Sequence, residues 1–374
     1  VLTIDGLKTY HYLAIGEFVM LHDVILPTGH FLESGNSKNT VSTSVPSSGD
    51  YAYYEDGVLT LCDYEYNGNA MAIRAFADLT VELTGGSKIN HIMSHAGDLT
   101  FKGAGALEIK RNMANDAVNV IGDVHVQNGL LTINGSGGSG IECNHFYLDN
   151  GKVWVTANFD GITVKNGLTV NGGVLVAKST GTTNDTLYSA INPTSDSPTI
   201  SIKSGLNHMV GTTSEEDTRL ATNFASGDYD FAALGDFVMV QGQILTYGNY
   251  MKSGTKPPIQ NSVADGYAYY AGNNRLILKN YSNSGTEYGI ASSVNLTIVL
   301  DGSSTLDSKN KSVSEGGGLY NIICCEAIKI WGDLTIEGRT SATDSLTAKS
   351  QEGEAIYVDG KLTVKGDRIT ATSG

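Results

Sequence analysis

The sequence predicts an all-β protein folded as a right-handed parallel β-helix, a solenoid in which short strands stack coil upon coil. Three observations lead to this fold class. There are 45 glycines against 6 prolines, which suits many tight turns between short strands. Apolar segments recur every 20 to 25 residues from Leu79 onward, and one phrase of two alternating apolar segments, AIYVDGKLTV at residues 355–364, returns in degraded form along the chain. Such coils bury their apolar sides by stacking on one another.

The first 60 or so residues are irregular and are expected to form cap-like strands. Strand-like runs occupy residues 18–25 and 58–61, and the polar tract 34–50 between them reads as a long loop. The segment YAYY at residues 51–54 precedes the second run. Its alternation sends Tyr51 and Tyr53 to one face of a strand and Tyr54 to the other.

Regular coils follow, with central strands expected near Leu79, Leu99, Val124, Phe146 and Leu168. In the clearest coil, residues 161–177, three strand segments are separated by Asn-Gly or Gly-Gly corners, so one coil closes as a triangle. Alternation predicts which side chains of this coil point into the solenoid. The expected inward residues are Ile162, Val164, Leu168, Val170, Val174 and Val176, and the expected outward ones are Thr163, Thr169 and Leu175.

The pattern then starts again, which predicts a tandem duplication. GEFVML at Gly16 is echoed by GDFVMV at Gly235, and the further echoes of YAYY, VLTL and residues 78–90 keep the offset between 216 and 219 residues. We therefore predict two units, residues 1–215 with five or six coils and residues 216–374 with central strands at Leu296, Leu334 and Leu362. Before the tandem boundary, residues 199–202 are expected to supply a last strand. In the second unit, the long interval before Leu334 is expected to contain a degenerate coil around residues 316–323.

Composition excludes several partners. The formal net charge of −15 disfavours nucleic acid, because phosphates repel an acidic protein. No apolar run approaches the length of about 18 residues that a membrane span needs, so no membrane insertion is expected within this chain. Val1 is not an initiator methionine, and we expect the chain to begin downstream of a removed signal or anchor. The four cysteines have no metal-binding spacing, and Cys143 is expected to be a buried apolar residue.

The order of a first strand, a YYxxxxLxL segment, a polar gap and repeated GIxxxGDLTIxxxG resembles the β-helical "carbohydrate-binding domain-containing" repeat modules in surface proteins of Gram-positive gut bacteria. Residues 269–278, 289–302 and 331–338 carry the resemblance in the second unit, and residues 98–103 carry it in the first. It implies a β-helical fold and an extracellular location, secreted or attached to the cell wall. It implies no catalytic motif.

Two sets of polar residues are candidate chemical sites. Asp78, Asp98, Asp123 and Asp333 each precede a central strand, where they could stack into a calcium-binding carboxylate column. Aspartate is also a preferred turn residue, and Asn295, His145 and Gly167 at the same place favour that reading. The histidines His91, His95, His125 and His145 show no metal-binding spacing. His125 stands at an outward position between Val124 and Val126 and is expected to be a surface histidine. The sequence thus predicts no catalytic residue, no metal site and no cofactor.

The tyrosines are the candidate ligand-binding residues. Both units carry them beside their first strands, and a tyrosine can stack on a sugar ring or anchor a protein contact. The alternative role is to cover the apolar end of each solenoid. The candidates are Tyr51, Tyr53 and Tyr54 with their echoes Tyr267, Tyr269 and Tyr270.

The resulting prediction is a non-catalytic module for adhesion or glycan contact, with glycans or host and cell-surface proteins as partners. Two alternatives remain. Parallel β-helices also support polysaccharide lyases and hydrolases, and a β-helix can serve as a purely structural surface stalk.

Overall fold

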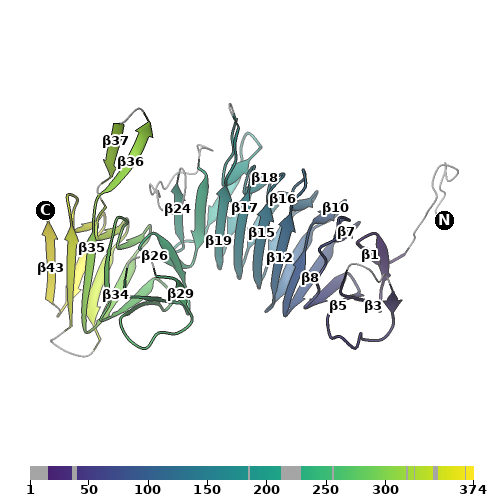
Figure 1. Cartoon of the computed structure of the whole chain (residues 1–374), viewed down its shortest axis with the longest axis horizontal. Coiled ribbons are helices and arrows are strands. Elements are labelled where there is room, and N and C mark those ends of the chain that lie inside the picture. Colours follow the sequence, from purple (N-terminus) through teal and green to yellow (C-terminus); the bar gives the residue numbers. More distant parts are fainter. Residues whose placement is uncertain are drawn as a thin grey trace.

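A computed structural model describes residues 16–35, 40–183, 186–211, 229–254, 257–316, 319–323, 325–339, 344–366 and 368–374. These residues form an all-β solenoid of about 12 turns in which most stacked strands are parallel (Figure 1), which confirms the predicted fold class. Among them, no helix is long and apolar enough to cross a membrane.

The first unit has three faces built from stacked parallel strands. Face 1 contains β7 (Ile73–Ala75), β10 (Ile92–Ser94), β13 (Val118–Val120), the first parts of β16 (Ile141–Leu148) and β18 (Ile162–Val170), and β22 (Ile191–Pro193). Face 2 contains β6 (Val58–Cys62), β8 (Leu79–Thr84), β11 (Leu99–Gly103), β14 (Val124–Val126), the second parts of β16 and β18, and β23 (Thr199–Ile202). Face 3 contains β9 (Gly86–Ile89), β12 (Ala106–Arg111), β15 (Leu130–Gly135), β17 (Lys152–Ala157) and β19 (Val174–Ser179).

The second unit repeats this arrangement with fewer coils. Its face 1 contains β33 (Ile290–Ser292), β38 (Ile328–Ile330) and β41 (Ile356–Val358). Its face 2 contains β31 (Arg275–Lys279), β34 (Leu296–Asp301), β39 (Leu334–Gly338) and β42 (Leu362–Lys365). Its face 3 contains β32 (Ser282–Gly285), β35 (Ser303–Ser308), β40 (Ser345–Ser350) and β43 (Arg368–Ser373).

Antiparallel strands open each unit. In the first, the hairpin of β1 (Phe18–Leu21) and β2 (Val24–Pro27) joins β7, while β3 (His30–Glu33), β4 (Val41–Ser42) and β5 (Tyr51–Glu55) extend face 2 beyond β6. In the second, β26 (Phe237–Val240) and β27 (Gln243–Thr246) join β33, while β28 (Tyr250–Lys252), β29 (Ile259–Gln260) and β30 (Tyr267–Tyr270) extend face 2 beyond β31. Pairing of this kind covers strand edges that would otherwise be open.

The duplication extends to single hydrogen bonds. The backbone NH of Tyr64 donates to Ser87 Oγ at 3.0 Å, and 217 residues later the NH of Tyr281 donates to Ser304 Oγ at 3.0 Å. Both tyrosine side chains are fully buried. The cap strands and first coil of the two units therefore share one local structure, as the constant sequence offset predicts.

The two units meet through a third apolar cluster, the junction cluster, which lies outside both solenoid interiors. It combines residues from face 3 of the first unit with residues from the first hairpin of the second. Its main members are Val174, Val176, Met209, Phe231, Ala233, Phe237, Met239, Ile244 and Ala291. The two larger clusters fill the interior of each unit separately.

The junction reverses one prediction. Leu175 belongs to the interior cluster of the first unit, whereas Val174 and Val176 face outward into the junction cluster. All three are buried, with 0 to 3% of their surface exposed. The expected orientation of β19 was wrong because both sides of this strand are covered by protein.

Strand pairing also crosses the predicted boundary at residue 216, which itself lies outside the described residues. β24 (Asn207–Gly211) and β25 (Phe231–Gly235) form an antiparallel pair, and β25 adds antiparallel to β19. Face 3 of the first unit therefore continues to Gly235. β23, as predicted, supplies one more strand beside β18.

The expected coil around residues 316–323 is a hairpin instead. β36 (Lys311–Gly316) and β37 (Leu319–Ile323) pair only with each other, antiparallel, and project from the solenoid (Figure 1). A second small hairpin joins β20 (Thr182–Thr183) and β21 (Thr186–Leu187). The long interval before Leu334 is thus an insertion at a corner and leaves the stacking of β34 on β39 unbroken.

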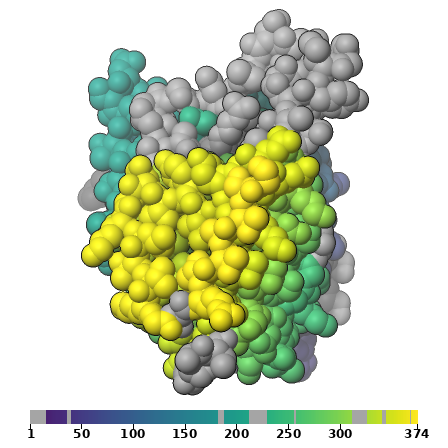
Figure 2. Space-filling view, turned by 90° about the vertical axis from the view of Figure 1, so that its left-hand side faces the viewer, coloured from purple at the N-terminus to yellow at the C-terminus, as the bar shows by residue number. Residues whose placement is uncertain are grey.

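The last described coil is open at its outer side. Figure 2 looks onto this end of the molecule, where residues of the final coils form the surface. Leu362 and Val364 occupy predicted inward positions but are 46% and 43% exposed, because no described strand stacks on β42 from that side.

Candidate functional site

Three aromatic rings lie together on the outward side of the cap strands in the first unit; we call them cluster 1. Phe31 on β3 and Tyr53 on β5 are directly opposed across the antiparallel pair. Their ring centroids are 4.3 Å apart at an interplanar angle of 29°, and Tyr51 meets Phe31 edge-on at 5.2 Å and 75°. All three side chains are half-buried, so part of each ring remains accessible.

The second unit carries the same arrangement, which we call cluster 2. Tyr250 on β28 opposes Tyr269 on β30. Their centroids are 4.4 Å apart at 32°, and Tyr267 meets Tyr250 edge-on at 5.1 Å and 80°. Two aromatic trios of nearly equal geometry therefore stand at equivalent places of a duplicated fold.

The six predicted tyrosines divide as the strand alternation requires. Tyr51, Tyr53, Tyr267 and Tyr269 face outward, whereas Tyr54 and Tyr270 are 5% and 0% exposed. The Tyr270 hydroxyl donates to the Asp236 carboxylate and accepts from the NH of Asn274 at 3.1 Å. Tyr54 and Tyr270 are therefore core residues of the caps, and their inclusion in the candidate ligand-binding set is corrected on grounds of burial.

Phe31 and Tyr250 belong to the clusters but were absent from the predicted set. A signal for them exists in the sequence, since GHFLESG at residues 29–35 aligns with GNYMKSG at residues 248–254 and places an aromatic residue at the same position of both units. What the sequence alone does not supply is the antiparallel pairing that brings this position opposite Tyr53 or Tyr269.

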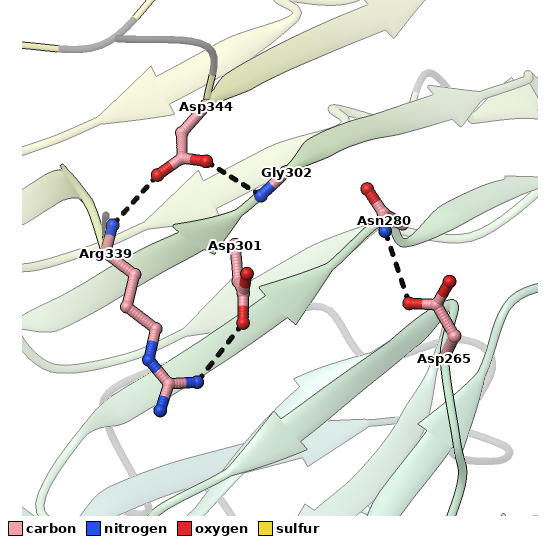
Figure 3. A network of polar contacts seen from close by, with 6 residues as sticks. All are labelled: Asp265, Asn280, Asp301, Gly302, Arg339 and Asp344. Carbon is pink, nitrogen blue, oxygen red and sulfur yellow. Dashed lines mark hydrogen bonds and ion pairs between the residues drawn. The ribbon is translucent and has the colours of Figure 1, made fainter. Parts of the chain in front are cut away.

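Charged and polar side chains border cluster 2. Across the sheet, Tyr267 is flanked by Lys252 and Lys279, and Lys279 is followed by Asp301. Figure 3 shows the adjoining corner, where the Arg339 guanidinium binds the Asp301 carboxylate at 3.2 Å. There, the buried Asp344 accepts the backbone NH groups of Gly302 and Arg339 at 2.9 and 3.0 Å, and Asn280 donates to Asp265 at 3.2 Å.

Cluster 1 has a comparable polar border. A hydrogen bond with the Glu55 carboxylate raises the pKa of the Tyr53 hydroxyl. Along the sheet, Tyr53 is followed by Thr60 and then by Glu82, which forms an ion pair with Lys102 at 3.3 Å. Aromatic faces beside hydrogen-bonding groups are suited to ligands that combine apolar and hydroxyl surfaces.

The aspartate column proves to be turn structure. Asp78 Oδ1 accepts the NH of Asp98 at 2.9 Å, and Asp98 Oδ1 accepts the NH of Asp123 at 2.8 Å. In the second unit Asp333 Oδ1 accepts the NH of Lys361 at 2.7 Å. Each carboxylate thereby ties its corner to the next coil, which is the role expected of a turn residue.

Asp98, Asp123 and His125 nevertheless come close enough to share a cation, with potential ligand atoms within 4.8 Å of one another. One oxygen of Asp98 already accepts a backbone NH, and one oxygen of Asp123 accepts the Asn144 amide at 2.7 Å. These carboxylates therefore have structural partners, and the grouping by itself does not identify a metal centre.

His125 lies on the outward side of its strand, as predicted, and the four histidines differ in burial. His125 and His145 stack on Tyr147 with centroid distances of 4.5 and 4.1 Å, on the outward side of face 2. His95 is exposed, whereas His91 is only 1% exposed. Burial, reinforced by Arg111 and Arg74, lowers the pKa of His91 to about 4. His91 occupies a corner position that the alternation does not describe.

Asp116 and Glu142 form a pair of carboxyl groups on face 1. A side-chain hydrogen bond to Asp116 is the main cause that raises the pKa of Glu142 to about 6, and burial and the Asp116 charge act in the same direction. Asn119 bridges the pair, donating to Asp116 Oδ2 at 2.9 Å and Glu142 Oε2 at 3.1 Å. The two acids thus share a proton at mildly acidic pH.

We expect Glu142→Gln to change how stability depends on pH. A pKa raised on folding contributes stability below the unfolded value of 4.5, and that stability is lost as the pH rises through about 6. At pH 7 the variant should be more stable than the wild type by at most about 1 kcal/mol after allowing for solvent screening, and the two should converge below pH 4.5. Urea unfolding between pH 4 and 8 measures this, with the exposed Glu352→Gln as control. A constant difference across that range would contradict the shared proton.

The two aromatic clusters occur in the same form in both units. They offer flat, accessible ring faces with polar borders, and they contain no nucleophile or metal-binding set among their described members. Comparison with known proteins adds no assignment: no family model matches the chain, and neither the curated proteins nor the solved structures contain a significant match.

Proposed function

We propose that this protein is a non-catalytic extracellular module, secreted or attached to a cell wall, that contacts glycans through clusters 1 and 2. One observation carries the proposal: the same outward trio of aromatic rings stands at equivalent places of both units. A buried core requires repeated inward apolar residues, but it does not require repeated outward rings with accessible faces.

The chemistry of the clusters fits sugars. The axial C–H groups of a pyranose pack on an aromatic face, and its hydroxyl groups need hydrogen-bonding partners at the edge. Glu55 beside Tyr53 and the lysines beside Tyr267 supply such partners. Both clusters lie on the cap end of face 2, so one chain presents two contact sites to a polymer. Two weak sites on one chain can raise the apparent affinity by about 10² to 10⁴.

Four buried tyrosines fill the alternative role, which is to cover the apolar end of each solenoid. Tyr54, Tyr64, Tyr270 and Tyr281 are buried in the caps, with at most 5% exposure. The outward tyrosines add cross-strand contacts of about 0.2–1 kcal/mol, which is a minor share of the stability of such a domain. Their removal should therefore test recognition without unfolding the protein.

We expect Tyr51→Ala combined with Tyr53→Ala to lower the apparent affinity for a bound polysaccharide by about 10²-fold through loss of the second contact. Adding Tyr267→Ala and Tyr269→Ala should abolish binding. A glycan array with the wild type identifies the polysaccharide, and surface plasmon resonance measures the variants. Tyr53→Phe, which keeps the ring, should bind like the wild type.

Tyr147→Ala is the matched control, because Tyr147 is an outward aromatic residue outside both clusters. Circular dichroism confirms that each variant is folded. Unchanged polysaccharide binding after loss of both clusters would contradict the proposal, as would equal loss of binding in Tyr147→Ala. An array and a host-protein screen without any ligand would favour a structural stalk.

The polysaccharide-acting enzyme is the second candidate, and Asp116 with Glu142 is the pair that would have to carry it. Glycoside hydrolases separate their two carboxyl groups by about 5–9.5 Å to admit the glycosidic bond or a water. Here the carboxyl groups are joined by a hydrogen bond, which leaves no such space. Release of reducing ends from a polysaccharide panel, lost in Glu142→Gln, would support this candidate over the binding module.

A further inference from the structure

An open pocket of about 360 Å³ lies where face 3 of the first unit turns toward face 1. Its lining includes the cationic residues Lys88, Lys110 and Arg111 and the acidic residues Glu65 and Glu108. Asn90, also in the lining, holds the adjoining loop by donating to the carbonyls of Gly68 and Ala70 at 2.6 and 2.7 Å. The lining therefore has a small positive charge, although the net charge of the chain is −15.

Arg111 is the residue that distinguishes this pocket. It ends β12 at a position that alternates with the interior residues Leu107 and Ile109, and it is only 7% exposed. Its neighbour in the next coil is Gly135, where the backbone carbonyls of Gly138 and Ser139 border the position that a side chain would take. The backbone pattern therefore directs a charged side chain toward the inside of the corner.

The Arg111 guanidinium has no anionic partner among the described residues. Its Nε has no hydrogen-bond partner, and no ion pair joins the group to an acid there. Asp116, the acid whose charge acts on the neighbouring His91, is engaged elsewhere, accepting the NH of Ser139 at 2.8 Å and the amide of Asn119 at 2.9 Å. His91 is buried beside Arg111, and neither of its ring nitrogens has a hydrogen-bond partner in the described part of the chain.

The acids of the lining do not compensate Arg111 either. Glu65 and Glu108 flank Lys88 on the two adjacent strands, one on each side. With three cations against two acids, the lining carries one net positive charge. A buried charge without a partner destabilises a protein unless another group compensates it, and a guanidinium offers a planar set of donors that matches an oxyanion.

We propose that this pocket binds an oxyanion group, a carboxylate or a sulfate, carried by a sugar of an acidic glycan. The inference rests on the proposed glycan contact and names the class of sugar. The volume of the pocket, about 360 Å³, falls in the range of pockets that hold one small ligand. Arg111 binds the anionic group inside the corner, Lys110 lies at the exposed side of the pocket, and Asn90 keeps the wall in place.

Isothermal titration calorimetry with three sugars tests the proposal: D-glucuronate, glucose 6-sulfate and neutral glucose. We expect at least one of the two anionic sugars to bind the wild type and glucose not to bind. Arg111→Met and Arg111→Gln should lower the affinity for the anionic sugar at least 10-fold. Lys349→Gln, which removes an exposed lysine of β40 in the second unit, should leave it unchanged.

Thermal unfolding of the free protein separates a binding role from a structural one. Because Arg111 is an uncompensated buried charge, Arg111→Met should raise the melting temperature while it removes binding. A structural role would lower the melting temperature. The proposal would be overturned if neither anionic sugar binds, or if glucose binds equally well. Binding that survives the loss of Arg111 would also overturn it, as would a lower melting temperature of Arg111→Met.

The cluster variants keep this test independent of the proposed function. Tyr53→Ala and Tyr269→Ala should retain Arg111-dependent binding of the anionic monosaccharide, because neither residue lines the pocket. If the tyrosine variants lose polysaccharide contact but keep Arg111-dependent binding, both proposals are supported. If the tyrosine variants keep both polysaccharide contact and Arg111-dependent binding, the result would contradict the role of the clusters in polysaccharide binding and support the pocket.

Discussion

Val176→Asp is expected to lower the free energy of unfolding by about 3–5 kcal/mol, because it places an unpaired carboxylate in the junction cluster. Val176 is 1% exposed although it faces away from the solenoid interior, and its neighbours in the cluster include Phe231 and Met239. Urea unfolding followed by circular dichroism measures the loss. Small-angle X-ray scattering should show the two units separating, since this cluster is the apolar contact between them.

Thr370→Asp is the matched control. Thr370 is the outward residue that follows the inward Ile369 on β43, the last face 3 strand of the second unit, as Val176 follows Leu175 on β19. Thr370 is exposed, so its replacement should change the stability by no more than about 0.5 kcal/mol. Equal effects of the two substitutions would contradict the burial of Val176 between the units.

Phe146→Ala should cost about 3–5 kcal/mol through a cavity in the middle of the first unit. The Phe146 ring is fully buried, and it is aligned with Val124 in the preceding coil and Leu168 in the following one. A gap at this place interrupts the apolar stack on both sides. Because each coil is stabilised by its neighbours, the loss should also make unfolding less cooperative.

Tyr147→Ala, one residue away, tests the alternation of side chains. Tyr147 points outward and contacts His125 and His145. We expect it to cost about 1 kcal/mol or less, the range of cross-strand contacts on a solvated face. Chemical denaturation of both variants gives the comparison. A larger loss for Tyr147→Ala than for Phe146→Ala would contradict the orientation of β16.

Local patterns in the sequence predicted most of the fold. The alternation of apolar and polar residues in the segment 161–170 predicts that Ile162, Val164, Leu168 and Val170 point into the solenoid, and all four are buried there. The aspartates before the central strands act as turn residues, and the constant offset between the units predicted two caps of equal structure. These features depend on contacts within one coil or between coils of similar sequence, so the sequence of each coil is sufficient to predict them.

The candidate sites were only partly predictable. Alternation separated Tyr51 and Tyr53 from Tyr54, but the place of Phe31 beside Tyr53 depends on antiparallel pairing across the polar segment 34–50. Arg111 was not recognised, because a charged residue at the end of an apolar alternation looks like a turn residue. Its importance comes from the absence of a compensating acid among its described neighbours, a property of the surroundings rather than of the motif.

In AIYVDGKLTV, the inward residues and the Asp-Gly corner follow from the phrase itself, since strand alternation and turn preference act within ten residues. The exposure of Leu362 does not, because it depends on what stacks on the last coil. β19 is the clearest case. Val174, Leu175, Val176 and Ala177 are all apolar, so either orientation suits the strand alone. The pairing of β19 with β17 and the packing of the junction cluster determine its orientation, because the outer side of this strand is covered only in the tertiary structure.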